Sequence, residues 1–270
     1  MLLNVLRSAI RGRKRHIPCP VCSSASPFLE SLDLNKSCAD TAQQLAFPPS
    51  GCVIDYHLCA NCGFCFSPEM MRWTTDKLRT EIYNDDYIIA DPHYVEKRPE
   101  NIAATLPGIF PLAGSNLRHL DFGGGDGRMS RRLCEAGWNS QAYDPFGANG
   151  RLAEPPTGLF ELITAIEVFE HAQNPHQTLA QLVSLLAPDG VIFFSTYVSD
   201  GENLAKNGLN WWYAAPRNGH ISLYTKETLR ILGRQFDLSC INLSVTNHLY
   251  CRPNSFWARV PISTFRRQGQ

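Results

Sequence analysis

The sequence lacks a long apolar run and carries no net charge. No stretch reaches the roughly 18 consecutive apolar residues that a membrane-spanning helix requires, so we expect no transmembrane segment. Lys plus Arg and Asp plus Glu number 25 each, so no overall electrostatic field favours nucleic acid, and we expect no nucleic-acid partner. Internal repeats and low-complexity tracts are also missing. The 270 residues, 44% of them hydrophobic, predict an ordinary soluble protein with one full domain core and a smaller module.

The first 16 residues form a basic segment without acidic side chains. Met1–Ile10 is apolar with one Arg, and four basic residues follow by position 15, which reverses the charge-then-apolar order of a secretory signal. We therefore expect a cytoplasmic protein. The segment also fits a short interfacial helix with weak membrane-surface contact, a mitochondrial presequence or a frayed basic terminus.

Residues 118–127 read Arg-His-Leu-Asp-Phe-Gly-Gly-Gly-Asp-Gly, a short apolar strand followed by closely spaced glycines. Glycine tolerates positive φ and has no Cβ, so Gly123, Gly125 and Gly127 let the backbone approach a ligand at the start of a helix. A dinucleotide fingerprint needs a third glycine where this chain has Arg128, and no Lys-Ser/Thr pair of a phosphate loop follows. The turn predicts a nucleotide cofactor, and a nicotinamide oxidoreductase is the weaker interpretation.

A second acidic residue supports an adenosine-bearing ligand. Asp144 follows an expected strand at Gln141–Tyr143, 23 residues after Asp121, where a carboxylate can accept both ribose hydroxyls. Alone, Asp144-Pro145 also fits a simple strand-to-turn transition. Only about 17 residues then precede the next expected strand, too few for a helix, a strand and another helix, so the third strand is expected to be short or missing.

The segment from Asp121 to Gly127 resembles motif I of the class I S-adenosylmethionine-dependent methyltransferases. Phe160–His171 resembles the motif IV strand of that family, and Ala187–Gly190 resembles the turn before its fifth strand. The resemblance implies an α/β, reduced Rossmann-like methyltransferase domain. It also implies S-adenosylmethionine as the cofactor, held by Asp121, Phe122, Gly123, Gly124, Gly125, Gly127, Asp144, Glu167 and Tyr87.

Seven of the ten cysteines lie between Cys19 and Cys65. Cys-x-x-Cys knuckles at 19–22 and 59–62 are separated by 36 residues, and two such knuckles can present four thiolates to a structural zinc ion. Unligated cysteines, a redox pair and disulfides are the weaker alternatives, and Cys65 competes for one ligand position. The expected zinc ligands are Cys19, Cys22, Cys59 and Cys62.

Other segments are read from their periodicity and their turn signals. Strands are expected at Val53–Leu58, Leu117–Phe122, Leu162–Ile166, Val191–Tyr197, Leu238–Ser244 and Phe256–Val260. Helices are expected at Asp76–Tyr83, Asn101–Phe110, Arg128–Ala136, Pro175–Leu186 and Lys226–Phe236, and a long aromatic loop at Ser199–Gly219.

The predicted organisation places a basic segment at 1–16, a zinc-binding module at 17–72, a helical connector and cofactor-closing segment at 73–116, and the Rossmann-like domain at 117–270. Paired cysteines, then an aromatic-acidic segment with Tyr83 and Tyr87, then motif I are similar to the zinc-bearing sugar C-methyltransferases. This likeness implies a small-molecule acceptor, with a nucleotide- or polymer-linked sugar preferred.

Methyl transfer to a hydroxyl or carbon acceptor needs a base, and His220 and His171 are the candidates. His220 resembles the position from which the sugar enzymes present a histidine, and a structural hydrogen-bonding role is the alternative. For His171 the alternative is helix capping or cofactor packing, and Trp211-Trp212-Tyr213 could stack on a sugar. We predict a methyltransferase forming C- or O-methyl products; a non-catalytic, cofactor-binding adaptor with the same fold is the second hypothesis.

Overall fold

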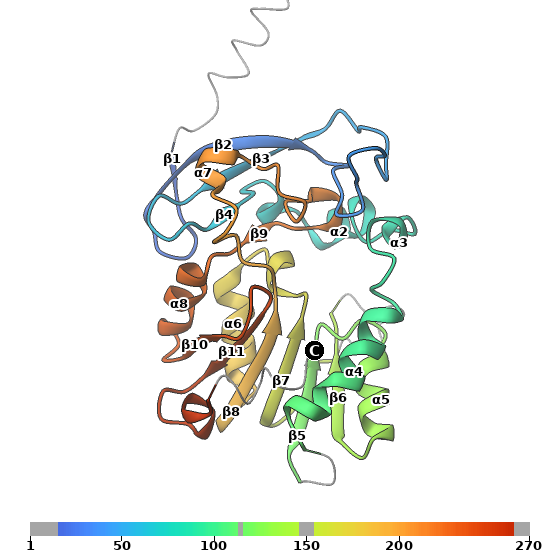
Figure 1. Ribbon diagram of the computed structural model, residues 1–270, viewed down its shortest axis with the longest axis vertical. Coiled ribbons are helices and arrows are strands. Elements are labelled where there is room, and N and C mark those ends of the chain that lie inside the picture. Colours follow the sequence, from blue (N-terminus) through green and yellow to red (C-terminus); the bar gives the residue numbers. More distant parts are fainter. Residues whose placement is uncertain (1–15, 113–115, 146–153, 262–270) are drawn as a thin grey trace, which may run out of the picture.

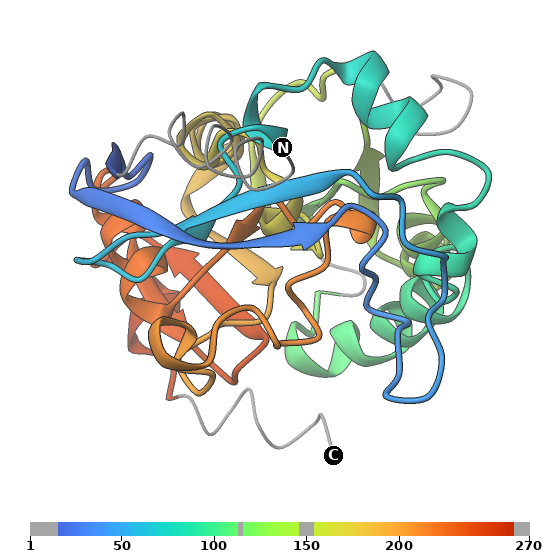
Figure 2. The same cartoon turned by 90° about the horizontal axis from the view of Figure 1, so that it is seen from above.

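The computed structural model describes residues 16–112, 116–145 and 154–261, which form two sheets. Figure 1 shows the smaller sheet lying across one end of the larger one, and Figure 2 shows its long strands from above. The smaller sheet has the order β1-β2-β3-β4-β9, with β1 (His16–Pro18), β2 (Ala25–Asp33), β3 (Val53–Leu58), β4 (Cys65–Phe66) and β9 (Ser222–Leu223).

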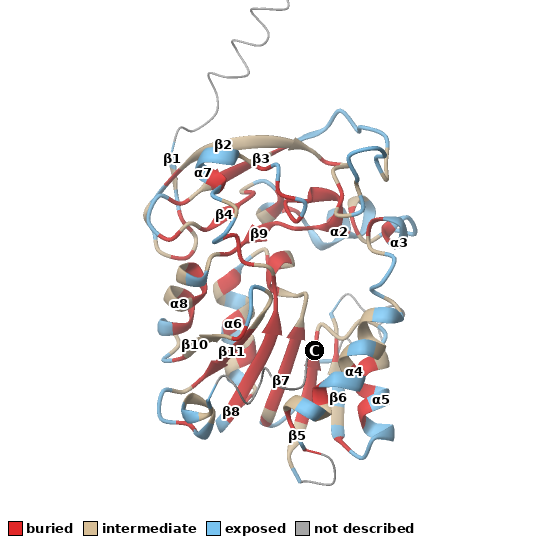
Figure 3. Ribbon diagram, viewed as in Figure 1, coloured by how far each residue is buried: buried red, intermediate tan, exposed pale blue. Residues whose placement is uncertain are grey.

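The larger sheet has the order β10-β11-β8-β7-β5-β6, and its first four strands in the chain run parallel. These are β5 (Arg118–Phe122), β6 (Asn139–Tyr143), β7 (Phe160–Ile166) and β8 (Leu186–Ser195), closed by the antiparallel β11 (Asn247–Cys251) and β10 (Ser239–Asn242). The central strands β5, β7 and β8 are buried along most of their length, as expected of a parallel sheet covered on both faces (Figure 3). The predicted α/β architecture is confirmed.

Helices cover both faces of this sheet. Apolar side chains of α4 (Lys97–Ile109) and α5 (Arg128–Glu135) pack with Leu162 on one face, and those of α6 (Pro175–Ser184) and α8 (Lys226–Arg234) pack with Ile163 on the other. Local sequence sets the helix starts: Asn174 caps α6, whose first residue is proline, and Thr225 and Thr228 form a capping box on α8. The shorter helices are α2 (Thr75–Glu81), α3 (Tyr87–Ala90) and α7 (Leu204–Asn207), with single 3-10 turns η1 (Met70–Arg72), η3 (Phe169–His171), η4 (Pro216–Asn218) and η5 (Phe256–Arg259).

The connection between β6 and β7 is short, as the sequence predicts. Its described residues, 144–145 and 154–159, contain neither helix nor strand. The larger sheet therefore ends at β6 on this side among the residues that the structure describes.

The two sheets are joined at the carboxyl end of β7. Gln173, just past that end, donates from its amide to the carbonyls of Met70 and Trp73, each at 2.8 Å, and Ser222 Oγ in β9 donates to the Ala172 carbonyl at 2.8 Å. Strand β9 pairs with β4, so residues after position 117 contribute to the amino-terminal sheet. The smaller sheet thus covers the edge at which the parallel strands end.

Two sequence predictions are wrong in the last third of the chain. Phe256–Arg259 forms a 3-10 turn, with Phe256 67% exposed, and the closing strand is instead Asn247–Cys251, whose residues pair with Val191–Ser195 of β8. Asp189-Gly190 does not precede a strand either. It lies within β8, where four residues separate Leu186 from Val191 opposite a single residue of β7, so the expected turn is a bulge in a longer strand.

In the described part of the chain, every helix is too short or too polar to cross a membrane. The predicted basic segment, apart from His16, lies outside the described residues.

Candidate active site

The glycine-rich turn follows β5 and has the left-handed backbone that its sequence predicts. Gly123, Gly125 and Gly127 have φ values of 77°, 59° and 78°. A Cβ added to Gly123 would lie 2.5 Å from Val168 Cγ2, whereas one added to Gly125 would meet nothing within 4 Å. Gly125 therefore faces open space, where a ligand can approach the backbone.

Asp144 is held directly against this turn. Strands β5 and β6 are neighbours, with Phe122 opposite Tyr143, so the residues that follow each strand lie together at one edge. The Gly125 N–H donates to Asp144 Oδ2 at 2.8 Å, and the Gly123 N–H donates to the Tyr143 carbonyl at 2.8 Å. The predicted pairing of a glycine turn with an acidic residue is therefore present in space.

Asp121 packs against the glycine turn on its buried side. Its side chain is 3% exposed, accepts a hydrogen bond from Thr164 Oγ1 at 3.3 Å, and would lie 2.6 Å from a Cβ added to Gly124. Burial raises the pKa of Asp121 to about 7, and the charges of Asp144 and Asp126 act in the same direction.

Glu167 directly follows β7 and has a φ of 52°, a conformation that residues other than glycine rarely adopt. Ser195 Oγ donates to its Oε1 at 2.7 Å, and the Tyr213 hydroxyl donates to its Oε2 at 3.3 Å. Burial, followed by the charge of Glu170, raises the pKa of Glu167 to about 8. The side chain is thus fixed at the carboxyl end of the strand, as its motif IV position predicts.

The two candidate histidines lie together beyond this strand. Their ring centroids are 5.2 Å apart; His220 Nδ1 is 2.6 Å from the Tyr213 carbonyl, and His171 Nδ1 is 3.1 Å from the Gly219 carbonyl. Burial lowers the pKa of both histidines, and His171 further lowers the pKa of His220. Both imidazoles are therefore neutral near pH 7.

Sequence reasoning missed Glu170, which is fully buried beside these histidines. Its Oε1 lies 4.0 Å from His171 Nε2, and burial raises its pKa. The spacing Glu167-x-x-Glu170-His171 at the end of an apolar strand was the available signal.

Tyr87 is buried at 7% exposure and donates from its hydroxyl to the Asn218 carbonyl at 3.3 Å. Tyr83 links it to the histidines: its ring lies 5.3 Å from that of Tyr87 and 6.1 Å from that of His171. In the aromatic loop Trp211 and Tyr213 are buried, while Trp212 is 48% exposed.

The four cysteines predicted as zinc ligands converge on one point, with all four sulfurs within 4.8 Å of one another. The Sγ–Sγ distances are 3.7 Å for Cys19–Cys62, 3.4 Å for Cys22–Cys59 and 3.5 Å for Cys22–Cys62. A tetrahedral ion with bonds of about 2.3 Å needs sulfurs about 3.8 Å apart, so this donor set fits zinc. Cys65, which pairs with β9, is not in the cluster, and all ten cysteines are free of disulfides.

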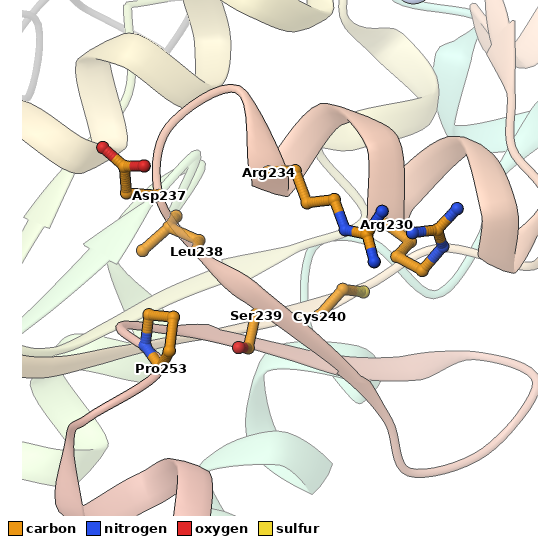
Figure 4. Close-up of a pocket in the computed structure, with 7 residues that line it drawn as sticks. All are labelled: Arg230, Arg234, Asp237, Leu238, Ser239, Cys240 and Pro253. Atoms are coloured by element: carbon orange, nitrogen blue, oxygen red, sulfur yellow. The ribbon is translucent and has the colours of Figure 1, made fainter.

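Figure 4 shows a pocket elsewhere, between α8 and β10, which contains none of the predicted site residues. Of its charged side chains, Arg230 forms an ion pair with Glu227. The pocket therefore has no part in the site described above.

A family model for a methyltransferase domain matches residues 94–243, more than half of the 270-residue chain. A ubiquinone biosynthesis O-methyltransferase from Ralstonia nicotianae is 28% identical over an alignment of 109 residues, and the match covers 32% of this chain and 44% of that protein. A tRNA U34 carboxymethyltransferase from Syntrophotalea carbinolica is 28% identical over 123 residues, 37% of each chain. The chain spans about half the length, or less, of these curated relatives.

Among solved structures, an O-methyltransferase family protein from Burkholderia thailandensis is 12% identical, with a TM-score of 0.47, over 68% of this chain and 66% of that chain. A 1,6-didemethyltoxoflavin-N1-methyltransferase from the same organism, with bound S-adenosylhomocysteine, is 16% identical, with a TM-score of 0.45, over 71% and 95%. The family match agrees with the sheet order and the glycine turn. The chain belongs to the methyltransferase-domain family.

Proposed function

We propose that this protein is an S-adenosylmethionine-dependent methyltransferase that acts on a small molecule. One observation carries the proposal: the open side of Gly125 lies next to Asp144, whose carboxylate the Gly125 N–H orients. A backbone free of Cβ can lie against the amino-acid portion of the cofactor, and the carboxylate can accept the ribose hydroxyls. Phe122, Gly123, Gly124 and Gly127 complete this turn, and Asp121 supports it.

Glu167 and Tyr87 are proposed to bound the methyl-donor side of the pocket. Glu167 lies close to the glycine turn, because the next residue, Val168, packs against Gly123. Tyr87 lies one aromatic ring away from His171, through Tyr83. The proposed cofactor site therefore lies between the glycine turn and the two histidines.

The acceptor proton is proposed to leave at the pair formed by His171 and His220. In-line displacement at a sulfonium methyl needs an oriented acceptor and, for a hydroxyl or carbon acceptor, a base. Both imidazoles have Nδ1 facing a backbone carbonyl, which can only accept, so Nδ1 carries the proton and Nε2 is unprotonated. Each Nε2 is therefore a candidate base.

A nucleotide- or polymer-linked sugar is the proposed acceptor, with C- and O-methylation both open to this base. Trp212 supports it, because its half-exposed ring packs edge-on against Tyr197 and offers an aromatic face for a sugar ring. The curated relatives named above act on other acceptors, so the acceptor is inferred from the chemistry of this chain.

The cysteine cluster is proposed to hold one structural zinc ion. The Asn61 side-chain amide donates to Cys22 Sγ at 3.6 Å, which favours the thiolate form that zinc requires. The Cys62 carbonyl accepts hydrogen bonds from Thr225 Oγ1 at 2.6 Å and Thr228 Oγ1 at 2.8 Å. The knuckle thereby docks on the start of α8.

Thermal unfolding with added ligand tests the cofactor assignment. S-adenosylhomocysteine at 100 times its dissociation constant should stabilise the protein by about 2.7 kcal/mol, while NADH at the same concentration should not. Stabilisation by NADH alone would restore the oxidoreductase interpretation. Turnover is then measured as methyl transfer from S-adenosylmethionine to a panel of nucleotide sugars.

A further inference from the structure

We propose that Glu170, His171 and His220 bind a divalent cation, at a second metal site separate from the cysteine cluster. One oxygen or nitrogen atom from each of these residues lies within 4.8 Å of the others; Glu170 and His220 are buried, and His171 is half-buried. The binding of this cation does not rest on the proposed function, but its role in catalysis does. With the cation bound, the two histidines would act as ligands and not as the base, and the cation would instead lower the pKa of an acceptor hydroxyl.

The two histidines are already oriented as metal ligands. His171 Nδ1 donates to the Gly219 carbonyl and His220 Nδ1 donates to the Tyr213 carbonyl, so Nε2 of each ring presents a lone pair. Metal-bound histidines in proteins usually have this arrangement, with the second ring nitrogen held by a carbonyl or carboxylate.

The buried carboxyl group of Glu170 is not explained if the two histidines act only as a base. It is 0% exposed, and among the described residues neither carboxylate oxygen has a partner in hydrogen-bonding geometry, although Tyr213, Glu167 and Thr196 lie close. A buried carboxylate is strongly disfavoured unless a positive charge or hydrogen bonds compensate it. A cation between Glu170 and the two imidazoles would supply that charge.

The geometry requires only a small contraction. A point equidistant from three atoms 4.8 Å apart lies about 2.8 Å from each of them. Metal–nitrogen and metal–oxygen bonds are about 2.1 Å, so each ligand atom has to move by at most about 0.7 Å. The Glu170–His171 distance of 4.0 Å is already within this limit.

The donor set selects the kind of cation. Two imidazoles and a carboxylate suit Mn²⁺, Fe²⁺, Co²⁺ or Zn²⁺, whereas the four thiolates of the cysteine cluster favour softer ions and disfavour Mn²⁺. Mn²⁺ therefore distinguishes the two sites. Val168, two residues before Glu170, packs against Gly123, so the cation would lie where it can polarise an acceptor oxygen near the methyl donor.

The test is a titration with Mn²⁺ of the full-length protein that carries one equivalent of zinc, which the cysteine cluster takes up first. Binding is measured as the loss of the electron paramagnetic resonance signal of free Mn²⁺. The wild type should bind one Mn²⁺ per chain. Glu170→Gln, which keeps the side-chain shape, should weaken binding at least tenfold, and so should His171→Asn. The control Glu69→Gln changes an exposed carboxylate and should leave binding unchanged. Zinc content should stay the same in all four proteins.

Absence of Mn²⁺ binding by the wild type would overturn the proposal without any variant. Equal binding by wild type and His171→Asn would also overturn it, even if Glu170→Gln did not fold. The S-adenosylhomocysteine response is recorded on the same samples. If the wild type binds Mn²⁺ but is not stabilised by S-adenosylhomocysteine, the cofactor assignment is rejected and the cation site is retained.

Discussion

Replacing Gly125 with alanine separates ligand binding from folding. An alanine at φ 59° costs about 1–2 kcal/mol, and its Cβ meets nothing within 4 Å, so the free protein should lose only that amount. At about 2–4 °C per kcal/mol, the melting temperature should fall by about 2–8 °C. The stabilisation by S-adenosylhomocysteine, about 2.7 kcal/mol in the wild type at 100 times the dissociation constant, should disappear because the Cβ occupies the ligand's side of the turn.

Gly51 provides the matched control. It also has a positive φ, 75°, and an added Cβ there meets nothing within 4 Å, but it lies just before β3 in the smaller sheet. Gly51→Ala should therefore lower the melting temperature by a similar amount and retain the full ligand response. Differential scanning fluorimetry measures both. A full response in Gly125→Ala, or a lost response in Gly51→Ala, would refute the assignment of the turn.

Three further changes test other parts of the site. Asp121 has a folded-state pKa of about 7 against 3.8 when unfolded, so the folded state retains a proton that the unfolded state releases. This one group should lower stability by about 4 kcal/mol as pH rises from about 4 to 7, so Asp121→Asn should reduce the total fall, to which Glu167 also contributes, by about that amount in urea titrations at several pH values. Cys59→Ser should reduce bound zinc from about one per chain to nearly none by elemental analysis, while the exposed Cys52→Ser should not; retained zinc would reject the cluster. Trp212→Ala should raise the acceptor KM about tenfold, equivalent to about 1.4 kcal/mol, with little change in kcat; an unchanged KM would exclude stacking.

The parts of the site that depend on local sequence were predictable. The glycine turn, its positive φ values and the helix that starts at Arg128 follow from residues adjacent in the chain. Asp144 was also found, because parallel neighbouring strands end at the same edge of a sheet. The cysteine knuckles were predictable for a similar reason, since each pair is local and only their meeting had to be inferred.

Features that depend on distant contacts were not predictable. Glu170 gains its importance from burial beside His220, 50 positions later in the chain, and no periodicity reports that approach. The strand at Asn247–Cys251 was missed because it is defined by its pairing with β8, which is distant in the chain. The apolar pair Phe256-Trp257 was instead interpreted as a strand, although it lies in a 3-10 turn. Strand β9, two residues long, is defined only by its partner β4.

Strand β9 makes the two halves of the chain interdependent. The Tyr56 hydroxyl, in β3, donates to the His220 carbonyl at 2.8 Å, and Ser222, two residues later, donates to the Ala172 carbonyl directly after η3. A fragment beginning near residue 117 would keep the glycine turn but lose the wall that positions the histidine. We therefore expect truncation to affect the proposed acceptor chemistry more than cofactor affinity, because the contacts that hold His220 come from the cysteine-bearing half of the chain.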